Sequence, residues 1–365
     1  MAEEKNTALK WKFEAGSSVF EPVLSEGVVY FGSENGELYA LDINTGDIKW
    51  KKRIEHFDSY PVVSNGLLYF WEYRDNKSYK FCALEPVTGE EKWNFQTQYS
   101  GPFTIMADMV LAGRGFTNAD NGADQSELAA INCNNGELKW KFIPDPYMYD
   151  DEFYQSRFSV SSKPMLSNET IYFGTFDNYL FALDNATGEE KWNFSDDYAL
   201  HMEEAVFGKK VPCNSIYTAP IVEQGLVCFA SGNLLYGIDI KTSNDFGFGD
   251  ETWKYEAEST IKRTLAVSEG IVFFCSDNNI LYAVGIKDGQ EKWKSKFLGN
   301  ISTPTVSMGM VYIGSDDKHL YGLDIKTGKE KLKFETGGIV STPAVSKRVV
   351  YFGSDHHLYA LHIPE

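Results

Sequence analysis

The stretch Ala40-Leu-Asp42-Ile-Asn-Thr45-Gly46-Asp-Ile-Lys-Trp50 decides the fold, because this chain of 365 residues repeats it. It returns most completely as Ala182-Leu-Asp184-Asn-Ala-Thr187-Gly188-Glu-Glu-Lys-Trp192. Weaker copies occupy residues 83–93, 130–140, 283–293 and 322–332. Such self-similarity is typical of solenoid and propeller folds, in which each repeat is one supersecondary unit.

Two sets of positions give the same number of repeats. The phrase closes at Trp11, Trp50, Trp93, Trp140, Trp192, Trp253 and Trp293, and Leu332 takes an eighth equivalent place. A proline opens most units, at Pro22, Pro61, Pro102, Pro164, Pro220, Pro304 and Pro343, and Leu265 replaces it in the remaining unit. The sequence therefore predicts eight repeats.

Each repeat is predicted to form four short strands. In the seventh repeat we expect them at Thr303–Ser307, Val311–Gly314, Leu320–Leu323 and Lys329–Phe334. Aromatic and β-branched residues alternate in these segments, and Gly, Asp, Asn and Ser separate them. Four-stranded sheets repeated about an axis form a β-propeller, so the predicted fold is all-β with eight blades.

The two ends of the sequence complement each other. The last repeat lacks a tryptophan strand, and residues 8–13 are a tryptophan strand with no repeat before them. We expect residues 8–13 to complete the last blade, formed by residues 339–363, within a single domain of residues 1–365. That arrangement closes the ring and leaves no free sheet edge between the ends.

The repeated residues have a structural explanation. The Asp of each phrase can accept hydrogen bonds from backbone N–H groups of the following turn, and the Gly can adopt positive φ there. The Trp buries a large ring, which we expect to contact the neighbouring blade. Because these residues recur in nearly every blade, we assign the seven tryptophans a structural role.

The phrase Ala-x-Asp-x-x-Thr-Gly-x-x-x-Trp, with Val28-Val-Tyr-Phe-Gly32 before it, resembles the repeat of PQQ-like propellers. That family includes quinoprotein dehydrogenases, which hold pyrroloquinoline quinone (PQQ) and Ca²⁺, and a non-enzymatic propeller of the bacterial outer-membrane protein assembly machinery. The resemblance implies a periplasmic or extracellular protein. It favours the non-enzymatic type, because the enzymes carry adjacent cysteines and large loops, whereas Cys82, Cys133, Cys213, Cys228 and Cys275 are separated here.

Composition excludes several kinds of partner. The net charge of −18 repels nucleic acid and anionic lipid surfaces. The sequence has no apolar run long enough for a transmembrane helix and no secretory leader. We expect a monomeric ring that binds a protein partner or a small anionic ligand, and a domain cut from a longer sensor protein is an alternative.

Long insertions are the candidate binding loops. They occupy residues 113–125, 143–158 and 195–216, all on one face of the predicted ring, and residues 71–74 of blade two adjoin that face. Inserted loops often bind partners. The candidate binding residues there are Trp71, Arg74, Arg114, Tyr147, Tyr149, Tyr154, Arg157 and His201. Two alternatives are that these loops pack on themselves, or that their acidic residues hold Ca²⁺.

A second candidate site lies where the first strands approach the axis. One aligned position carries Ser59, Ser162, Thr218, Ser302 and Ser341, whereas blade six carries Arg263 there, next to Lys262. Glu21 and Lys163 occupy the following position. Arg263 and Lys262 could bind an anionic ligand, and the favoured alternative is that Arg263 pairs with a carboxylate such as Glu21.

These patterns favour a non-catalytic scaffold or ligand-binding module that uses the loop-rich face of blades two to five. We identify no catalytic residues and no metal ligands, and we predict no cofactor. His319 and His357 occupy matching turns, where solvated side chains are favoured over a shared metal site. The alternative function is a PQQ- or small-anion-binding protein, including a quinoprotein-type oxidoreductase with PQQ and Ca²⁺.

Overall fold

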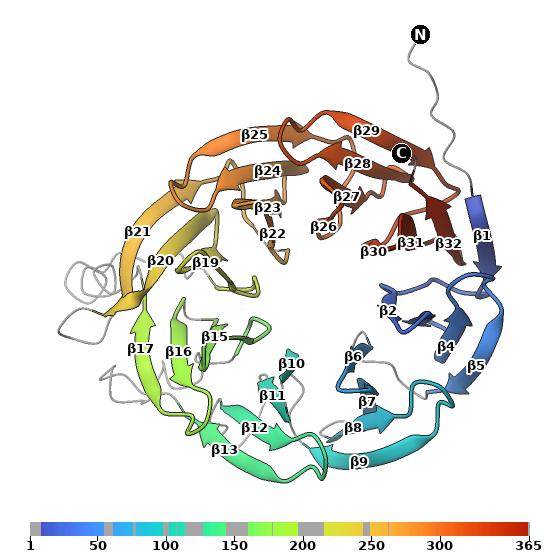
Figure 1. Cartoon of the computed structure of the whole chain (residues 1–365), viewed down its shortest axis with the longest axis horizontal. Coiled ribbons are helices and arrows are strands. Elements are labelled where there is room, and N and C mark those ends of the chain that lie inside the picture. The colour runs from blue at the N-terminus through green and yellow to red at the C-terminus, as the bar shows by residue number, and fades with distance from the viewer. Residues whose placement is uncertain are drawn as a thin grey trace.

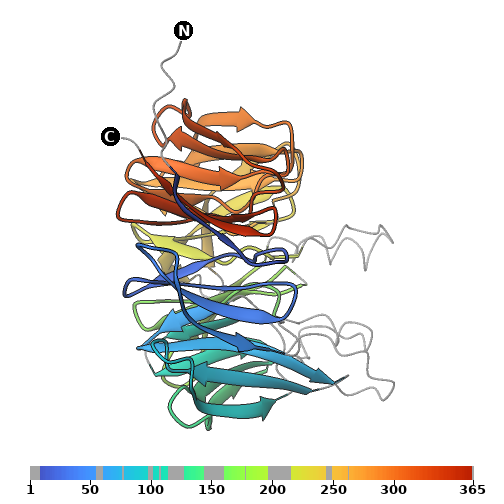
Figure 2. The same ribbon diagram turned by 90° about the vertical axis from the view of Figure 1, so that its right-hand side faces the viewer.

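The computed structural model describes residues 9–54, 61–75, 78–97, 102–106, 108–113, 127–143, 160–176, 178–195, 215–243, 249–261 and 263–363. These residues form 32 strands in eight four-stranded antiparallel sheets. The sheets follow one another around a ring (Figure 1), and the ring is a disc when seen from its rim (Figure 2). The predicted eight-bladed propeller is therefore confirmed.

The first four blades follow the chain in order. Blade one contains β2 (Val23–Ser25), β3 (Val28–Gly32), β4 (Glu37–Asp42) and β5 (Ile48–Arg53). Blade two contains β6 (Val62–Ser64), β7 (Leu67–Asp75), β8 (Ser78–Leu84) and β9 (Glu91–Thr97). Blade three contains β10 (Phe103–Met106), β11 (Met109–Gly113), β12 (Leu128–Asn132) and β13 (Leu138–Phe142). Blade four contains β14 (Met165–Ser167), β15 (Thr170–Gly174), β16 (Leu180–Asp184) and β17 (Glu190–Phe194).

The remaining blades repeat the pattern. Blade five contains β18 (Ile221–Glu223), β19 (Leu226–Ser231), β20 (Leu234–Ser243) and β21 (Gly249–Glu256). Blade six contains β22 (Ala266–Ser268), β23 (Ile271–Ser276), β24 (Ile280–Gly285) and β25 (Glu291–Lys296). Blade seven contains β26 (Thr305–Ser307), β27 (Met310–Gly314), β28 (His319–Asp324) and β29 (Glu330–Glu335), within two residues of the expected bounds. Blade eight contains β30 (Ala344–Ser346), β31 (Val349–Ser354), β32 (His357–His362) and β1 (Leu9–Glu14).

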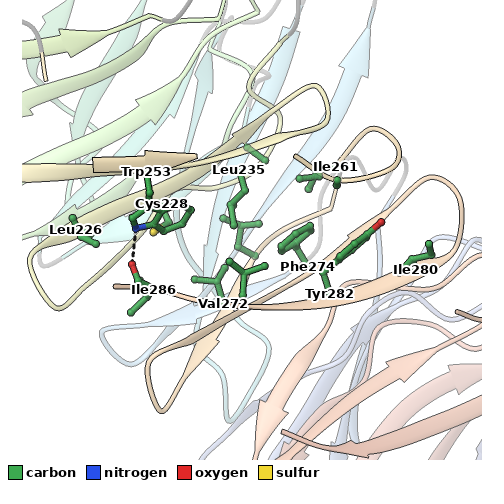
Figure 3. Packing of buried hydrophobic residues seen from close by; sticks show 14 residues of the cluster. Leu226, Cys228, Leu235, Trp253, Ile261, Val272, Phe274, Ile280, Tyr282 and Ile286 are labelled. Carbon is green, nitrogen blue, oxygen red and sulfur yellow. Dashed lines mark hydrogen bonds between the residues drawn. The ribbon is translucent and has the colours of Figure 1, made fainter. Parts of the chain in front are cut away.

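The hydrophobic core is divided among the junctions between blades. Eight clusters of buried residues each draw side chains from two neighbouring blades. Figure 3 shows the cluster between blades five and six, where Leu235 and Cys228 face Val272 and Phe274. Each blade therefore buries both faces only when its two neighbours are in place.

A tryptophan on the outer strand joins five of these junctions. Its indole Nε1 donates to a carbonyl oxygen of the next blade, at 2.8 Å from Trp253 to Ile286 (Figure 3) and 3.0 Å from Trp140 to Asn185. The other three pairs are Trp11–Ile43, Trp50–Pro86 and Trp293–Ile325. The indole ring also lies against the turn glycine of the next blade. A Cβ atom on Gly188, which has a φ of 74°, would stand 2.5 Å from Trp140.

Three junctions depart from this arrangement. Between blades seven and eight, Leu332 takes the place of the tryptophan. Between blades two and three, Phe95 takes the place against Gly136, and Nε1 of the neighbouring Trp93 has no hydrogen-bond partner among the described residues. Between blades four and five, Trp192 is buried in the cluster that the two blades share, and no described hydrogen bond joins its indole to the next blade. Trp93 therefore does not make the contact expected of every repeat tryptophan.

The first strand of the chain closes the ring. β1 pairs with β32, with Phe13 opposite Leu358, as expected from the two ends of the sequence. Trp11 of β1 then donates to the Ile43 carbonyl of blade one at 3.1 Å. In Figure 1, β1 lies beside β32 on one side and the blade containing β4 and β5 on the other. One strand thus completes blade eight and joins it to blade one.

Deleting residues 1–14 should destabilise the ring strongly. The deletion exposes the edge of β32 and removes buried Trp11 from the junction with blade one, so we expect the free energy of unfolding to fall by about 3 kcal/mol or more. Urea denaturation followed by tryptophan fluorescence measures the change. A synthetic peptide of residues 8–14, added in excess, should restore part of the loss. Unchanged stability after the deletion would contradict the closure by β1.

The two kinds of tryptophan junction should respond differently to the same substitution. Trp140→Phe leaves the Asn185 carbonyl without its indole donor, which should cost about 1–2 kcal/mol in the free energy of unfolding. Trp93→Phe is the matched control, because its Nε1 donates to no described group. We expect a smaller loss for Trp93→Phe, measured by thermal and urea unfolding. Equal losses would show that the hydrogen bond contributes nothing to the junction.

Candidate functional site

One face of the ring carries both the turns between second and third strands and the connections between blades. Backbone hydrogen bonds link the two kinds of segment: Ile54 N–H donates to Gly36 O and Thr336 N–H to Lys318 O, both at 2.8 Å. The predicted insertions lie almost wholly outside the described residues, so their place on this face remains a prediction. We call this face the loop-bearing face.

Most of the candidate binding residues lie outside the described part of the chain. Those residues are Arg114, Tyr147, Tyr149, Tyr154, Arg157, His201 and Lys262. The backbone of Arg74 belongs to β7, but the structure does not describe the side chain of this residue. The binding roles expected for all of them remain predictions.

Trp71 does not lie on the surface. Its side chain is 1 % exposed, with its ring centroid 4.4 Å from that of Phe81 and 5.8 Å from that of Phe103 in the next blade. The other blades have Gly or another small residue at this position of the second strand; a Cβ on Gly113, for example, would stand 2.6 Å from Val160. Trp71 thus fills the space that a blade connection occupies elsewhere, and the expectation of a surface contact was wrong for this residue.

The hairpin formed by β7 and β8 extends beyond the described hairpins of second and third strands in the other blades, on the loop-bearing face. In blade one, pairing of the second and third strands ends at Gly32 opposite Leu38. In blade two, strand pairing continues past the equivalent pair, Trp71–Phe81. It runs through Glu72–Lys80 and Tyr73–Tyr79 to Asp75–Ser78. The Tyr73 and Tyr79 rings meet edge to face with their centroids 5.4 Å apart. The hairpin therefore presents two packed tyrosines above the level of the neighbouring blade.

A second aromatic pair on this face escaped the sequence analysis. Tyr217 precedes β18 and is 44 % exposed, and its ring meets that of Phe176 at 5.4 Å and 86°. Ser215 Oγ donates to the Phe176 carbonyl at 2.6 Å, which ties the blade connection to the turn after β15. The signal available in the sequence was the large Tyr217 next to the Thr218-Ala-Pro220 sequence that opens blade five.

The hydroxyl groups expected near the channel mouth are bonded inside the blades. Ser162 Oγ accepts from Gly174 N–H at 2.7 Å, and Thr218 Oγ1 accepts from Ala230 N–H at 2.8 Å. Ser302 and Ser341 accept in the same way, at 2.9 Å, from Gly314 and Gly353. Ser59 lies outside the described residues. These four groups hold the starts of blades four, five, seven and eight against their second strands and are not aimed at a ligand.

Arg263 replaces that hydroxyl in blade six and is exposed. Within the described part of the chain it forms no ion pair, and Glu21 instead accepts a hydrogen bond from the Thr342 hydroxyl. The favoured pairing of Arg263 with Glu21 is therefore wrong. Nearby Cys275 is buried, which raises the pKa of its thiol to about 12, and the Arg263 charge opposes this shift. The proximity of Arg263 does not create a reactive thiolate.

The described side chains do not fit PQQ and Ca²⁺. Cys82, Cys133, Cys228 and Cys275 form no disulfide within the described part of the chain, are buried and lie in four different blades, so no two of them are adjacent. Among the described residues, no group of three His, Cys, Asp or Glu side chains could hold a metal. His319 and His357 each approach a carbonyl of their own turn, Nδ1 of His319 at 2.9 Å from Asp317 O, rather than each other.

The described residues also contain no helix that is long and apolar enough to cross a membrane. This finding concerns only the part of the chain that the structure describes.

Known proteins resemble this chain in sequence and in fold. The lupanine 17-hydroxylase [cytochrome c] of Pseudomonas sp is 23 % identical over 255 residues, which cover 52 % of this chain and 36 % of that protein. The outer membrane protein assembly factor BamB of Moranella endobia is 25 % identical over 197 residues, 48 % of this chain and 44 % of the relative. The chain thus spans less than half the length of these relatives.

The crystal structure of BamB from Moraxella catarrhalis superposes with a TM-score of 0.71, at 18 % identity and 98 % coverage of both chains. At that identity the likeness shows the fold alone. The profile of one family, described as outer membrane protein assembly factor BamB, matches residues 3–144 and 244–364. These two segments make up most of the 365-residue chain. The chain therefore belongs to the PQQ-repeat propeller family of outer membrane protein assembly factor BamB.

Proposed function

We propose that this protein is a non-catalytic scaffold that binds another protein through its loop-bearing face, on the side of blades two to five. The observation that carries the proposal is the placement of two aromatic pairs, Tyr73–Tyr79 and Phe176–Tyr217, on that face. Aromatic side chains are enriched where proteins bind one another. Family membership and the name of the BamB relatives support a role in protein assembly.

The chemistry of the described residues agrees with a scaffold. The repeated polar residues are used in the turns: Asp184 Oδ1, for example, accepts from the backbone N–H groups of Ala186 and Thr187 at 2.9 and 3.1 Å. The buried cysteines and the backbone-bonded hydroxyls are likewise used in the fold. The residues that remain for recognition are aromatic side chains on extended loops, which suit a protein surface better than a reaction.

The partner that fits this proposal is a subunit of an outer-membrane protein assembly apparatus, and the protein would then act in the periplasm. This part of the proposal rests on the family and its BamB members. The net charge of −18 favours a partner surface that carries lysine and arginine. The long insertions, including Tyr147, Tyr149 and Tyr154, would contribute to the same contact.

Photo-crosslinking tests the proposed face. A crosslinking amino acid at Tyr217 should capture a protein partner in cells, because this side chain is exposed beside the loops. The matched control is Met308, which is 56 % exposed in the turn between β26 and β27 on the opposite face. Phe176→Ala should reduce the yield from position 217 without changing the melting temperature by more than a few degrees.

Capture from position 308 and none from position 217 would assign binding to the other face. Capture from neither position, in a folded protein, would contradict the scaffold function on these surfaces. Mass spectrometry of the crosslinked partner tests the proposed compartment. A cytosolic partner would contradict the proposal that the protein acts in the periplasm.

A further inference from the structure

The innermost strands of the ring surround a water-accessible channel. In seven blades the first strand has three residues, and all three are half-buried, although the second strands beside them are almost wholly buried. Neighbouring first strands contact one another, as β2 does with β6 and β30. Since protein surrounds these strands on the outside, their exposed atoms face the central channel of the propeller.

In the six blades where it is described, one position points into this channel. The hydroxyl residue three places before the first strand is bonded to the second strand, and the proline one place before the strand is buried in most blades. The residue between them keeps contact with water. The described members of this ring are Glu21, Lys163, Ala219, Thr264, Thr303 and Thr342. We call them the channel ring.

The channel ring carries one charge of each sign and three hydroxyls. Glu21 accepts a hydrogen bond from Thr342, its neighbour around the ring. Lys163 forms no ion pair or hydrogen bond with any described residue. Burial by the surrounding protein lowers the pKa of Lys163, and the Glu21 charge opposes that shift. The two charges therefore occupy matching positions on different blades around the channel, and they form no ion pair with each other.

We propose that the channel ring binds a small zwitterion, with the carboxylate of the ligand at Lys163 and its ammonium group at Glu21. The site lies on the axis, apart from the aromatic pairs of the loop-bearing face, and does not depend on the proposed scaffold function.

The arrangement of charges favours this class of ligand over a simple anion. An anion held by Lys163 would be repelled by Glu21, whereas a molecule with both charges gains an attraction at each end. Thr342 holds the Glu21 carboxylate in place, so the negative end of the site is preorganised. Thr264 and Thr303 supply further hydroxyls on the intervening blades, whereas Ala219 adds no polar group.

Calorimetric titration of the full chain tests the proposal. The probes are glycine, γ-aminobutyrate and ε-aminocaproate, which separate the same two charges by increasing lengths. Butyrate and butylammonium are the controls, each with one of the two charges. We expect at least one zwitterion to bind about tenfold or more tightly than either control, as expected when a second charged hydrogen-bond partner is gained. This comparison uses the unaltered protein and does not depend on the folding of a variant.

Variants then assign the two ends of the site. Lys163→Met and Glu21→Gln should each reduce zwitterion affinity to the level of a single-charge control. Lys51→Met, in the exposed part of outer strand β5, should leave it unchanged. The single charge reversals Glu21→Lys and Lys163→Glu should each abolish zwitterion binding. The double variant that carries both reversals should restore it.

Two results would overturn the proposal. One is that butyrate binds as tightly as the zwitterions, which would make Lys163 a plain anion site. The other is that none of the zwitterions binds at millimolar concentration. Thermal unfolding of each variant shows whether a loss of binding reflects the site or the fold.

Discussion

The contact between an outer-strand tryptophan and the turn glycine of the next blade is the constraint on which the ring depends. The glycine must lack a side chain, because the indole lies where a Cβ would be, and it must adopt positive φ to form the turn. The indole Nε1 then satisfies a carbonyl that the turn leaves exposed. One pair of residues therefore fixes the distance and the angle between two sheets that share no ladder hydrogen bonds.

The repeating part of the structure was predictable because its physics is local. Asp42, Gly46 and Trp50 each have a role within one turn or one junction, so a pattern in the sequence becomes a pattern in space. Ring closure was predictable for the same reason, since a tryptophan strand without a blade must pair with a blade that lacks one. The bounds of the blade-seven strands followed from the alternation of residues in β27 and β28.

The candidate site was less predictable, because it depends on where individual side chains point. Trp71 looked like a loop residue, yet it replaces a glycine in a second strand and is buried. Ser162 and Ser302 looked like channel residues, yet their neighbours one place further along face the channel instead, because side chains alternate along extended backbone. The Trp93–Phe95 exchange left the repeat pattern intact and could be seen only from the packing.

The closure by β1 also sets the order in which the protein can be completed. β1 is the first described strand of the chain and pairs with β32, the last, so this ladder joins residues that are farthest apart in the sequence. During synthesis β1 must wait, with an unpaired edge and an exposed tryptophan, until every other blade exists. Contacts of such long sequence separation form slowly and leave edges open to aggregation in the meantime. A newly made chain therefore needs protection of its N-terminal strand for longer than that of any other strand.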